Sequence, residues 1–384
     1  MLKKKITFIY SNSAEKNLYM PIYEEAKIRG YEVKMTDNPQ EKCEIGFYCQ
    51  HVNYPRNSKF SLIMLHDSIQ QSDDWPDIWY KEHWNKYDIG ILPDKNWVNN
   101  YNKSSQFFYT NPRRGVYQIG WPKADSIIKY KNNINEIRKK YGIDNNKKTV
   151  LYAPSWENDN KQDDFVKATF NLNVNMLIKQ FDYDKNTMPE FYDNVIKMKE
   201  KHKNIKNVII LPPETNIFEA IAVSDILISD GSSTMYEAAM LKVPSILVTN
   251  WLIPGPDHST YPNNNYDFVI ESKKEDLEKT INEILNDYEK YKNTITQYCD
   301  DNFLNIGCTS KKIMDIIDDC VNENEIRYKP LEKKAKQKLS LRKYLLTEFW
   351  AVSTYLFNKY FMKNKYLKKF SYKVVNFVHS KQII

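Results

Sequence analysis

The sequence is poor in glycine and cysteine. Its 384 residues include nine glycines and neither a GxGxxG nor a GxxxxGK[ST] motif, so the commonest dinucleotide and P-loop fingerprints are absent. Five scattered cysteines form no CxxC pair, which indicates neither a disulfide framework nor a zinc knuckle and favours a reducing compartment. No uncharged apolar run reaches the roughly 18 residues of a membrane-spanning helix. The length is nevertheless sufficient for two or three domains.

The net charge of +7 is unevenly distributed along the chain. After residue 326, fifteen Lys or Arg residues and two acids give a charge of +13, and the preceding part carries −6. Aromatic and apolar residues lie between these lysines. This composition is typical of helices that lie in a membrane interface and bind anionic lipid, and the alternative is helices that pack back onto the body. We expect no nucleic-acid partner and a cytoplasmic protein held peripherally at the inner face of the membrane.

Short apolar runs alternate with helical patterns in two successive series, which predicts an α/β fold with two Rossmann-like domains facing a cleft. The first series of strands is expected over residues 5–10, 31–35, 44–48, 60–65, 87–92 and 115–119. The second is expected over 149–152, 175–179, 207–211, 226–229 and 245–248. We predict an N-terminal acceptor domain over 1–145, a nucleotide-donor domain over 146–325, and a basic amphipathic helical tail over 326–384.

The most informative segment is 224–248, SDILISDGSSTMYEAAMLKVPSILV. A predicted strand ends at residue 229, and a helix begins after a tight turn. Unpaired helix N–H groups, with the hydroxyls of Ser232, Ser233 and Thr234, suit a phosphate or pyrophosphate. Glu237, one turn further, is placed to accept the hydroxyls of a ribose. The structural alternative is an ordinary helix cap with a first-turn acid.

These residues carry a family resemblance. SDGSSTMYEAAMLKVPSIL resembles the [ST]DYSS motif of the CDP-glycerol glycerophosphotransferase family, which comprises teichoic acid primases and polymerases of the GT-B fold. LYAPSWE at 151–157 resembles the YAPTWR segment of that family, and IGWPKAD at 119–125 resembles its G-x-PR-x-D segment. The resemblance covers roughly 115–250. It implies a CDP-alditol or other nucleotide-activated donor, a glycan or lipid-linked acceptor, and no cofactor.

The resemblance also implies roles for single residues. Ser232 and Ser233 would hold the donor phosphate, Asp230 would order the loop, and Glu237 stands where the family usually has Asp. Two loops at strand ends complete the expected donor site, one beside the phosphate and one beside the base, although both also suit ordinary packed turns. The expected donor-binding residues are Pro154, Ser155, Trp156, Pro213, Thr215, Asp230, Gly231, Ser232, Ser233, Thr234 and Glu237.

The expected catalytic residues are His66, Asp67 and Lys179. His66, in LIMLHDS, corresponds to the histidine of a WHG-like family segment. An imidazole exchanges protons near neutral pH and suits a general base, although a lone histidine at a strand end is often structural. Asp67 would orient the imidazole or the substrate. MLIKQFD keeps the family's Lys179 but has Phe181 in place of its second histidine. No set of residues has metal-ligand spacing, so no bound metal is expected.

The sequence therefore predicts an enzyme that moves glycerol phosphate, or a related alditol phosphate, from a CDP-activated donor to an acceptor in cell-surface polymer synthesis. One alternative is a GT-B glycosyltransferase with a UDP- or CMP-linked sugar, which the departure at Phe181 favours. Another is a catalytically silent nucleotide-binding subunit of a polysaccharide assembly complex.

Overall fold

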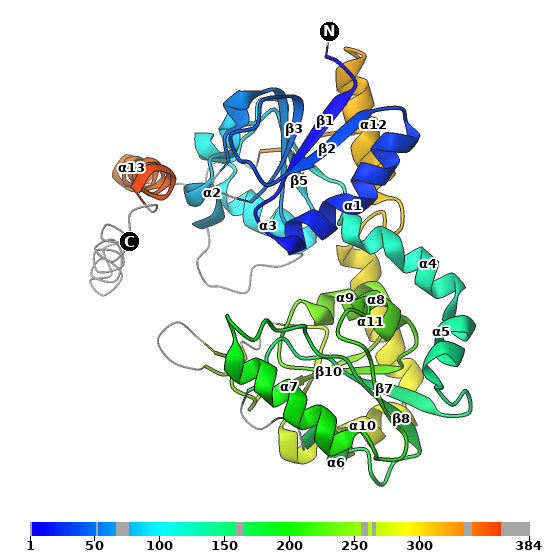
Figure 1. The fold of residues 1–384 in the computed structure, drawn as a ribbon. Coiled ribbons are helices and arrows are strands. Elements are labelled where there is room, and N and C mark those ends of the chain that lie inside the picture. Colours follow the sequence, from blue (N-terminus) through cyan, green and yellow to red (C-terminus); the bar gives the residue numbers. More distant parts are fainter. Residues whose placement is uncertain are drawn as a thin grey trace. The chain divides into compact units, whose positions relative to one another are not determined.

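The computed structural model describes residues 2–50, 53–66, 77–158, 161, 164–254, 260–262, 266–333 and 340–361. The chain divides into two compact units (Figure 1). Unit 1 combines residues 1–123 with those from 308 onward, and unit 2 contains residues 124–307. This division differs from the predicted boundaries of 1–145, 146–325 and 326–384. The described part of the predicted tail belongs to unit 1 and forms no unit of its own.

The chain returns to unit 1 through helix α12, Thr309–Val321, which packs against helix α1, Ser13–Ile28. Arg29, just after α1, holds the two helices together. Its guanidinium donates hydrogen bonds to Asp315 and Asp318 of α12 at 2.8 and 2.7 Å. These contacts join residues almost 290 positions apart, and hydropathy patterns carry no information about such pairings.

Unit 1 contains a six-stranded parallel sheet in the order β2-β1-β3-β4-β5-β6. Its strands are β1 Lys5–Ile9, β2 Glu32–Thr36, β3 Cys43–Cys49, β4 Ser58–Met64, β5 Ile89–Leu92 and β6 Val116–Gln118. Its other helices are α2 Asp77–Lys81, α3 Lys95–Ser104 and α13 Leu341–Leu356. The strand order reverses between β1 and β3. Ligands of such sheets bind outside the carboxyl ends of the strands at the point of reversal.

Unit 2 contains a second parallel sheet, in the order β12-β11-β10-β7-β8-β9. Its strands are β7 Lys148–Tyr152, β8 Val174–Ile178, β9 Val208–Ile210, β10 Ile226–Ser229, β11 Ser245–Val248 and β12 Ile270–Ser272. Its helices are α4 Ile127–Asn132, α5 Ile134–Tyr141, α6 Asp164–Lys167, α7 Pro189–His202, α8 Ile217–Ala222, α9 Thr234–Met240, α10 Leu277–Asn286 and α11 Tyr288–Asn302. This is the Rossmann strand order, with its reversal between β7 and β10.

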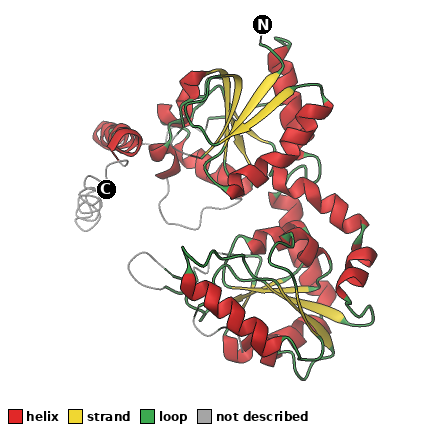
Figure 2. Ribbon diagram, viewed as in Figure 1, coloured by secondary structure: helices red, strands yellow, loops and turns green. Residues whose placement is uncertain are grey.

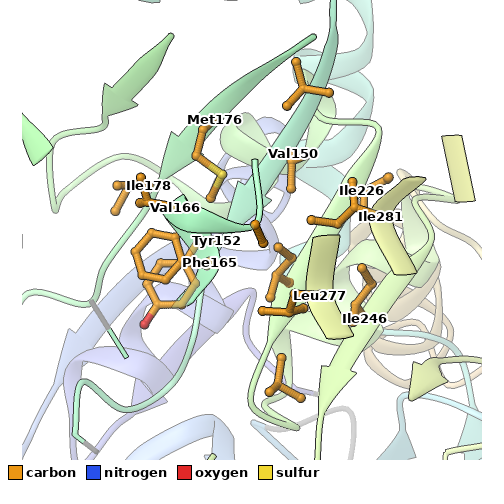
Figure 3. Close-up of a cluster of buried hydrophobic side chains, with 14 of the residues drawn as sticks. Val150, Tyr152, Phe165, Val166, Met176, Ile178, Ile226, Ile246, Leu277 and Ile281 are labelled. Atoms are coloured by element: carbon orange, nitrogen blue, oxygen red, sulfur yellow. The ribbon is translucent and has the colours of Figure 1, made fainter. Parts of the chain in front are cut away.

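Apolar side chains on one face of the second sheet form a continuous core (Figure 3). Alternate residues of a strand share a face, so Val150 and Tyr152 of β7 align with Ile226 of β10 in the same layer. Helices α6, α7 and α10 cover this face, and the ring of Tyr152 stacks on Phe165 of α6 at a centroid distance of 3.6 Å. Helices cover both faces of each sheet (Figure 2). The predicted α/β architecture is thus confirmed.

Helix α13 is docked on unit 1 through one face. Ala351 and Tyr355 are buried, and the ring of Tyr355 stacks on His83 at a centroid distance of 4.4 Å. Another side of the helix is apolar and exposed. We call this face the α13 stripe; it consists of Leu341, Leu345, Phe349, Val352 and Leu356. The alternative of a tail that packs back is thus correct for one face of α13. Among the described residues, no helix has the length and apolar character needed to cross a bilayer.

Candidate active site

The turn between β10 and α9 lies at the strand-order reversal of unit 2. Gly231 has φ 83°, a conformation that a residue with a Cβ rarely adopts. An added Cβ would also meet Leu247 and Pro262 at 3.3 Å. Ser232 is buried, and its hydroxyl lies 3.0 Å from that of Ser229. Ser233 and Thr234 are half-buried at the helix start. The turn therefore presents the two half-buried hydroxyls and keeps Ser232 for its own structure.

Asp230 connects this turn to the loop after β7. Its carboxylate accepts hydrogen bonds from the backbone N–H groups of Ser155 and Trp156 at 2.8 and 3.1 Å. It also accepts one from Nζ of Lys161 at 2.9 Å, and both side chains of this ion pair are fully buried. The predicted loop-ordering role of Asp230 agrees with these bonds. Because Asp230 takes both amides, these two N–H groups are not available to a phosphate, whereas the Ser155 hydroxyl can donate to one.

Glu237 is buried in the first turn of α9, with 3% of its surface exposed. Pro154 is buried at the end of β7, and the half-buried ring of Trp156 lies 5.5 Å from that of Phe191. The strand-order reversal thus brings two predicted parts of the donor site together. One is the loop of Pro154, Ser155 and Trp156, and the other is the segment 230–237. These residues come from the carboxyl ends of two strands that pair directly, β7 and β10.

Lys179 and the loop after β9 form a second part of the predicted site. The Lys179 ammonium donates hydrogen bonds to the carbonyl oxygens of Gln180 and Pro213 at 2.8 and 2.9 Å, and the residue is 9% exposed. Thr215 is buried in the same loop. Phe181, at the position of the family histidine, is 62% exposed. Lys179 therefore fixes the loop of Pro213, and the aromatic ring of Phe181 faces solvent beside it.

Glu157 is a buried acid next to these residues that the sequence did not single out. It has no exposed surface, and its Oε2 accepts a hydrogen bond from the Tyr152 hydroxyl at 3.2 Å. Burial raises the pKa of Glu157 to about 7, because the charged carboxylate loses its hydration. Burial also raises the pKa of Tyr183, whose hydroxyl donates to the Ser155 carbonyl at 2.5 Å. The floor of the site is thus a dense buried polar network.

His66 lies in unit 1, just beyond β4, and is half-buried. Trp121 Nε1 donates a hydrogen bond to its carbonyl oxygen at 3.1 Å, which fixes the backbone at the strand end. Asp67 lies outside the described residues. Glu15 and Cys49 approach the imidazole, and their potential ligand atoms lie within 4.8 Å of one another and of a ring nitrogen. Sequence spacing gives no sign of this group, because its members come from the first turn of α1, the end of β3 and the residues after β4.

The family model "CDP-Glycerol:Poly(glycerophosphate) glycerophosphotransferase" matches residues 85–301, more than half of the chain. The chain belongs to this family. The matched segment contains the whole β10–α9 turn and its partners in unit 2. His66 and Glu15 precede the matched segment, so the family match gives no support to a role for either residue.

Two relatives illustrate the similarity within the family. A teichoic acid poly(glycerol phosphate) polymerase of Bacillus spizizenii is 26% identical over 60% of this chain and 59% of its own length. A teichoic acid glycerol-phosphate transferase of Staphylococcus aureus is 25% identical over 46% of this chain and 48% of its own. The chain thus spans about half the length of these curated relatives.

Solved structures share the fold at low identity. The wall teichoic acid polymerase TagF has a TM-score of 0.59 with 16% identity, covering 83% of this chain and 89% of that one. A UDP-N-acetylglucosamine 2-epimerase homologue from Listeria monocytogenes has a TM-score of 0.58 with 10% identity, covering 86% and 100%. The predicted GT-B-like architecture is therefore confirmed as a likeness of fold.

Proposed function

We propose that this chain transfers glycerol phosphate, or a related alditol phosphate, from a CDP-activated donor to a glycan or lipid-linked acceptor in cell-surface polymer synthesis. The observation that carries the proposal is the β10–α9 turn, which joins Ser233, Thr234 and Glu237 at the strand-order reversal of unit 2. Helix N–H groups and hydroxyls favour an anion, and a nearby carboxylate favours sugar hydroxyls. Family membership and a structure of TagF soaked with CDPG support this choice of donor.

In the proposed reaction, an acceptor hydroxyl attacks the donor phosphorus that carries the alditol. A new P–O bond forms, the bond to the bridging oxygen breaks, and CMP leaves with that oxygen. His66 takes the proton from the acceptor hydroxyl as general base. The donors of the β10–α9 turn stabilise the negative charge that develops on the departing nucleotide.

A glycosyltransferase that uses a UDP- or CMP-linked sugar is the second candidate. Phe181 favours it, because the exposed aromatic ring stands where the resemblance expects a second histidine. The third candidate, a silent nucleotide-binding subunit, would use the same turn without turnover.

One donor panel separates the three candidates. Thermal shifts with CDP-glycerol, CDP-ribitol, UDP-sugars and CMP-sugars identify the donor that binds. A second assay then measures the CMP or UDP released when a membrane fraction supplies the acceptor. We expect stabilisation by a CDP-alditol and release of CMP. His66→Ala should keep the thermal shift and lose the release. Release of UDP from a UDP-sugar, or of CMP from a CMP-sugar, would favour the second candidate. Binding without release in the parent protein would favour the third.

We also propose that the protein acts in the cytoplasm, peripherally bound to the inner face of the membrane through α13. The α13 stripe runs along a side of the helix separate from its buried residues, and its side chains are exposed in the described part of the chain. Arg342 and Lys343 are exposed beside it. Apolar side chains flanked by basic residues favour an anionic lipid surface. A lipid-linked acceptor would be reached from the same surface.

A further inference from the structure

Glu15, Cys49 and His66 form a compact group of three different ligand types in unit 1. One potential ligand atom from each residue lies within 4.8 Å of the others, and Glu15 and Cys49 are buried. The group lies at the strand-order reversal between β1 and β3, where the carboxyl ends of β1, β3 and β4 are neighbours. Each residue follows or ends a different one of these strands.

Local periodicity explains why the three side chains meet. Alternate residues of β3 share a face, so Cys49 points to the same side of the sheet as Phe47. The Phe47 ring contacts Phe8 of β1 and Tyr19 of α1. Glu15 and Tyr19 are one helical turn apart on the inner side of α1, and both are buried. The pair Cys49–Met64 in the β3–β4 register places the end of β4, and His66 beyond it, beside Cys49.

Glu15 and the end of β3 are held in place by hydrogen bonds. The Glu15 Oε2 accepts hydrogen bonds from the backbone N–H and the hydroxyl of Ser11 at 2.6 and 2.9 Å, so the other carboxylate oxygen can bind a cation. Hydrogen bonds of this kind to a ligand side chain hold it in the orientation that a metal requires. After Cys49, Gln50 adopts φ 47° and its N–H donates to the Met64 carbonyl at 2.9 Å. This turn fixes the end of β3.

We propose that Glu15, Cys49 and His66 bind a Zn²⁺ ion. A thiolate, an imidazole and a carboxylate are ligands that zinc accepts together, whereas Mg²⁺ and Ca²⁺ take oxygen ligands. Two ligand atoms on a tetrahedral zinc lie about 3.4–3.6 Å apart, given bonds of roughly 2.3 Å to sulfur and 2.1 Å to nitrogen or oxygen. Side-chain rotations that bring these atoms closer by up to about 1 Å would therefore close the site. Three protein ligands leave a fourth position for water.

The site has a consequence for turnover, and this consequence rests on the proposed function. Zinc takes the lone pair of one imidazole nitrogen and holds the ring in place. His66 bound in this way cannot swing to an acceptor hydroxyl as a free base. We infer that Zn²⁺ is a reversible inhibitor of transfer, and that chelation restores activity.

Binding is tested without any activity measurement. The full chain is titrated with Co²⁺, whose thiolate complex gives a charge-transfer absorption, and then with Zn²⁺ to displace it. We expect one ion per chain and loss of the band in Cys49→Ser. The affinity for the metal should fall by more than about 100-fold in this variant, because replacing a residue that only hydrogen-bonds a ligand already costs about 10- to 100-fold. Glu15→Gln should weaken binding. Cys43→Ser is the matched control, since Cys43 lies on the same strand but hydrogen-bonds Ser58 at 3.1 Å.

A cobalt band that persists in Cys49→Ser, or is absent from the parent protein, would overturn the site. If the site binds zinc but CMP release is unaffected, only the inhibitory consequence fails. If the parent protein releases no CMP under any condition, the proposed function fails while the binding result stands. Loss of activity on chelation would overturn the inhibitory consequence.

Discussion

Lys161 and Asp230 form an ion pair in which neither side chain has any exposed surface, with Nζ 2.9 Å from Oδ2. Asp230 also accepts two backbone N–H bonds, and the Lys161 ammonium donates to the Trp156 carbonyl at 3.0 Å and lies 5.3 Å from the centre of the Trp251 ring. A buried ion pair of this kind is tolerated because every charge has partners. The pair therefore joins the loop after β7 to the turn before α9 and fixes the backbone of the proposed donor site.

Asp230→Asn should destabilise unit 2 strongly. The change leaves the Lys161 ammonium buried without a counter-charge, which costs roughly 3–5 kcal/mol. Urea denaturation, combined with hydrogen exchange of β7 and β10 peptides, measures the loss. The control is Glu200→Gln, which breaks an exposed pair with Lys203 and should change little. Equal stability of the two variants would contradict the assigned role of Asp230.

Much of the fold could be predicted from the sequence, because buried parallel strands are short apolar runs between polar turns. Strand β11 was predicted with its observed bounds, whereas β12 has only three residues and was missed. The continuous helical pattern after β12 forms two helices, α10 and α11, separated at Asp287. Helix α1 begins at Ser13, because the Asn12 side chain caps it by accepting a hydrogen bond from the N–H of Glu15.

The candidate site could be predicted only where a motif is continuous in sequence. The segment 230–237 is such a motif, and its position at the end of β10 follows from the strand before it. Lys161 lies outside any apolar pattern, and its partner Asp230 is far away in the sequence. Glu15, read locally, is an ordinary first-turn acid of α1. Its approach to Cys49 and His66 depends on strand order, which apolar patterns do not specify.

Glu157 predicts a pH-dependent stability of unit 2. Its pKa is about 7 in the folded chain, and an unfolded glutamate has a pKa of about 4.3. Between these values the folded state holds a proton that the unfolded state has lost, so stability falls as pH rises through this window, by roughly 3 kcal/mol. Glu157→Gln should remove this dependence and be more stable than the parent at pH 8. Glu190→Gln, an exposed change on α7, is the control and should leave the pH profile unchanged. Identical profiles for the parent and both variants would rule out Glu157 as the source of the pH dependence.

Ser232 and Ser233 should respond differently to replacement by alanine. Ser232 is buried and bonds within the turn, so Ser232→Ala should cost about 1 kcal/mol of stability. Ser233 is half-buried at the helix start, so Ser233→Ala should leave the melting temperature unchanged and weaken CDP-glycerol binding roughly tenfold, the equivalent of about 1.4 kcal/mol. Calorimetric titration and thermal unfolding measure the two effects. Unchanged donor affinity in Ser233→Ala would remove Ser233 from the proposed site.

The docking of α13 should weaken in acid. His83 Nε2 donates to the Ala351 carbonyl at 3.0 Å, and burial lowers the pKa of His83 to about 4, with Lys86 and Lys359 adding positive charge nearby. Because the folded pKa lies below the unfolded value of about 6.5, the stabilisation is complete above pH 6.5 and is lost as pH falls toward 4.

Hydrogen exchange at pH 7 and pH 5, corrected for the intrinsic rate, measures this effect. Amides of α13 should lose protection at pH 5, while those of α10 in unit 2 should not. In His83→Gln, whose amide can still donate to Ala351, the difference between the two pH values should disappear. Equal protection of α13 at both pH values in the parent protein would refute the role of His83.

The α13 stripe should carry membrane binding. Leu345, Phe349 and Val352 are 57%, 66% and 38% exposed on one side of the helix, whereas Ala351 and Tyr355 hold its other side on unit 1. Replacing the three exposed residues by serine therefore keeps α13 docked, which deletion of the tail would not. Burial of each apolar side chain in the membrane contributes about 1.5 kcal/mol or more to binding. The partition coefficient onto anionic vesicles, measured by sedimentation, should therefore fall by at least roughly 100-fold. Ile28→Ser, at a 79% exposed position on α1, is the control and should sediment like the parent. If the triple variant also sediments like the parent, α13 is not the membrane contact.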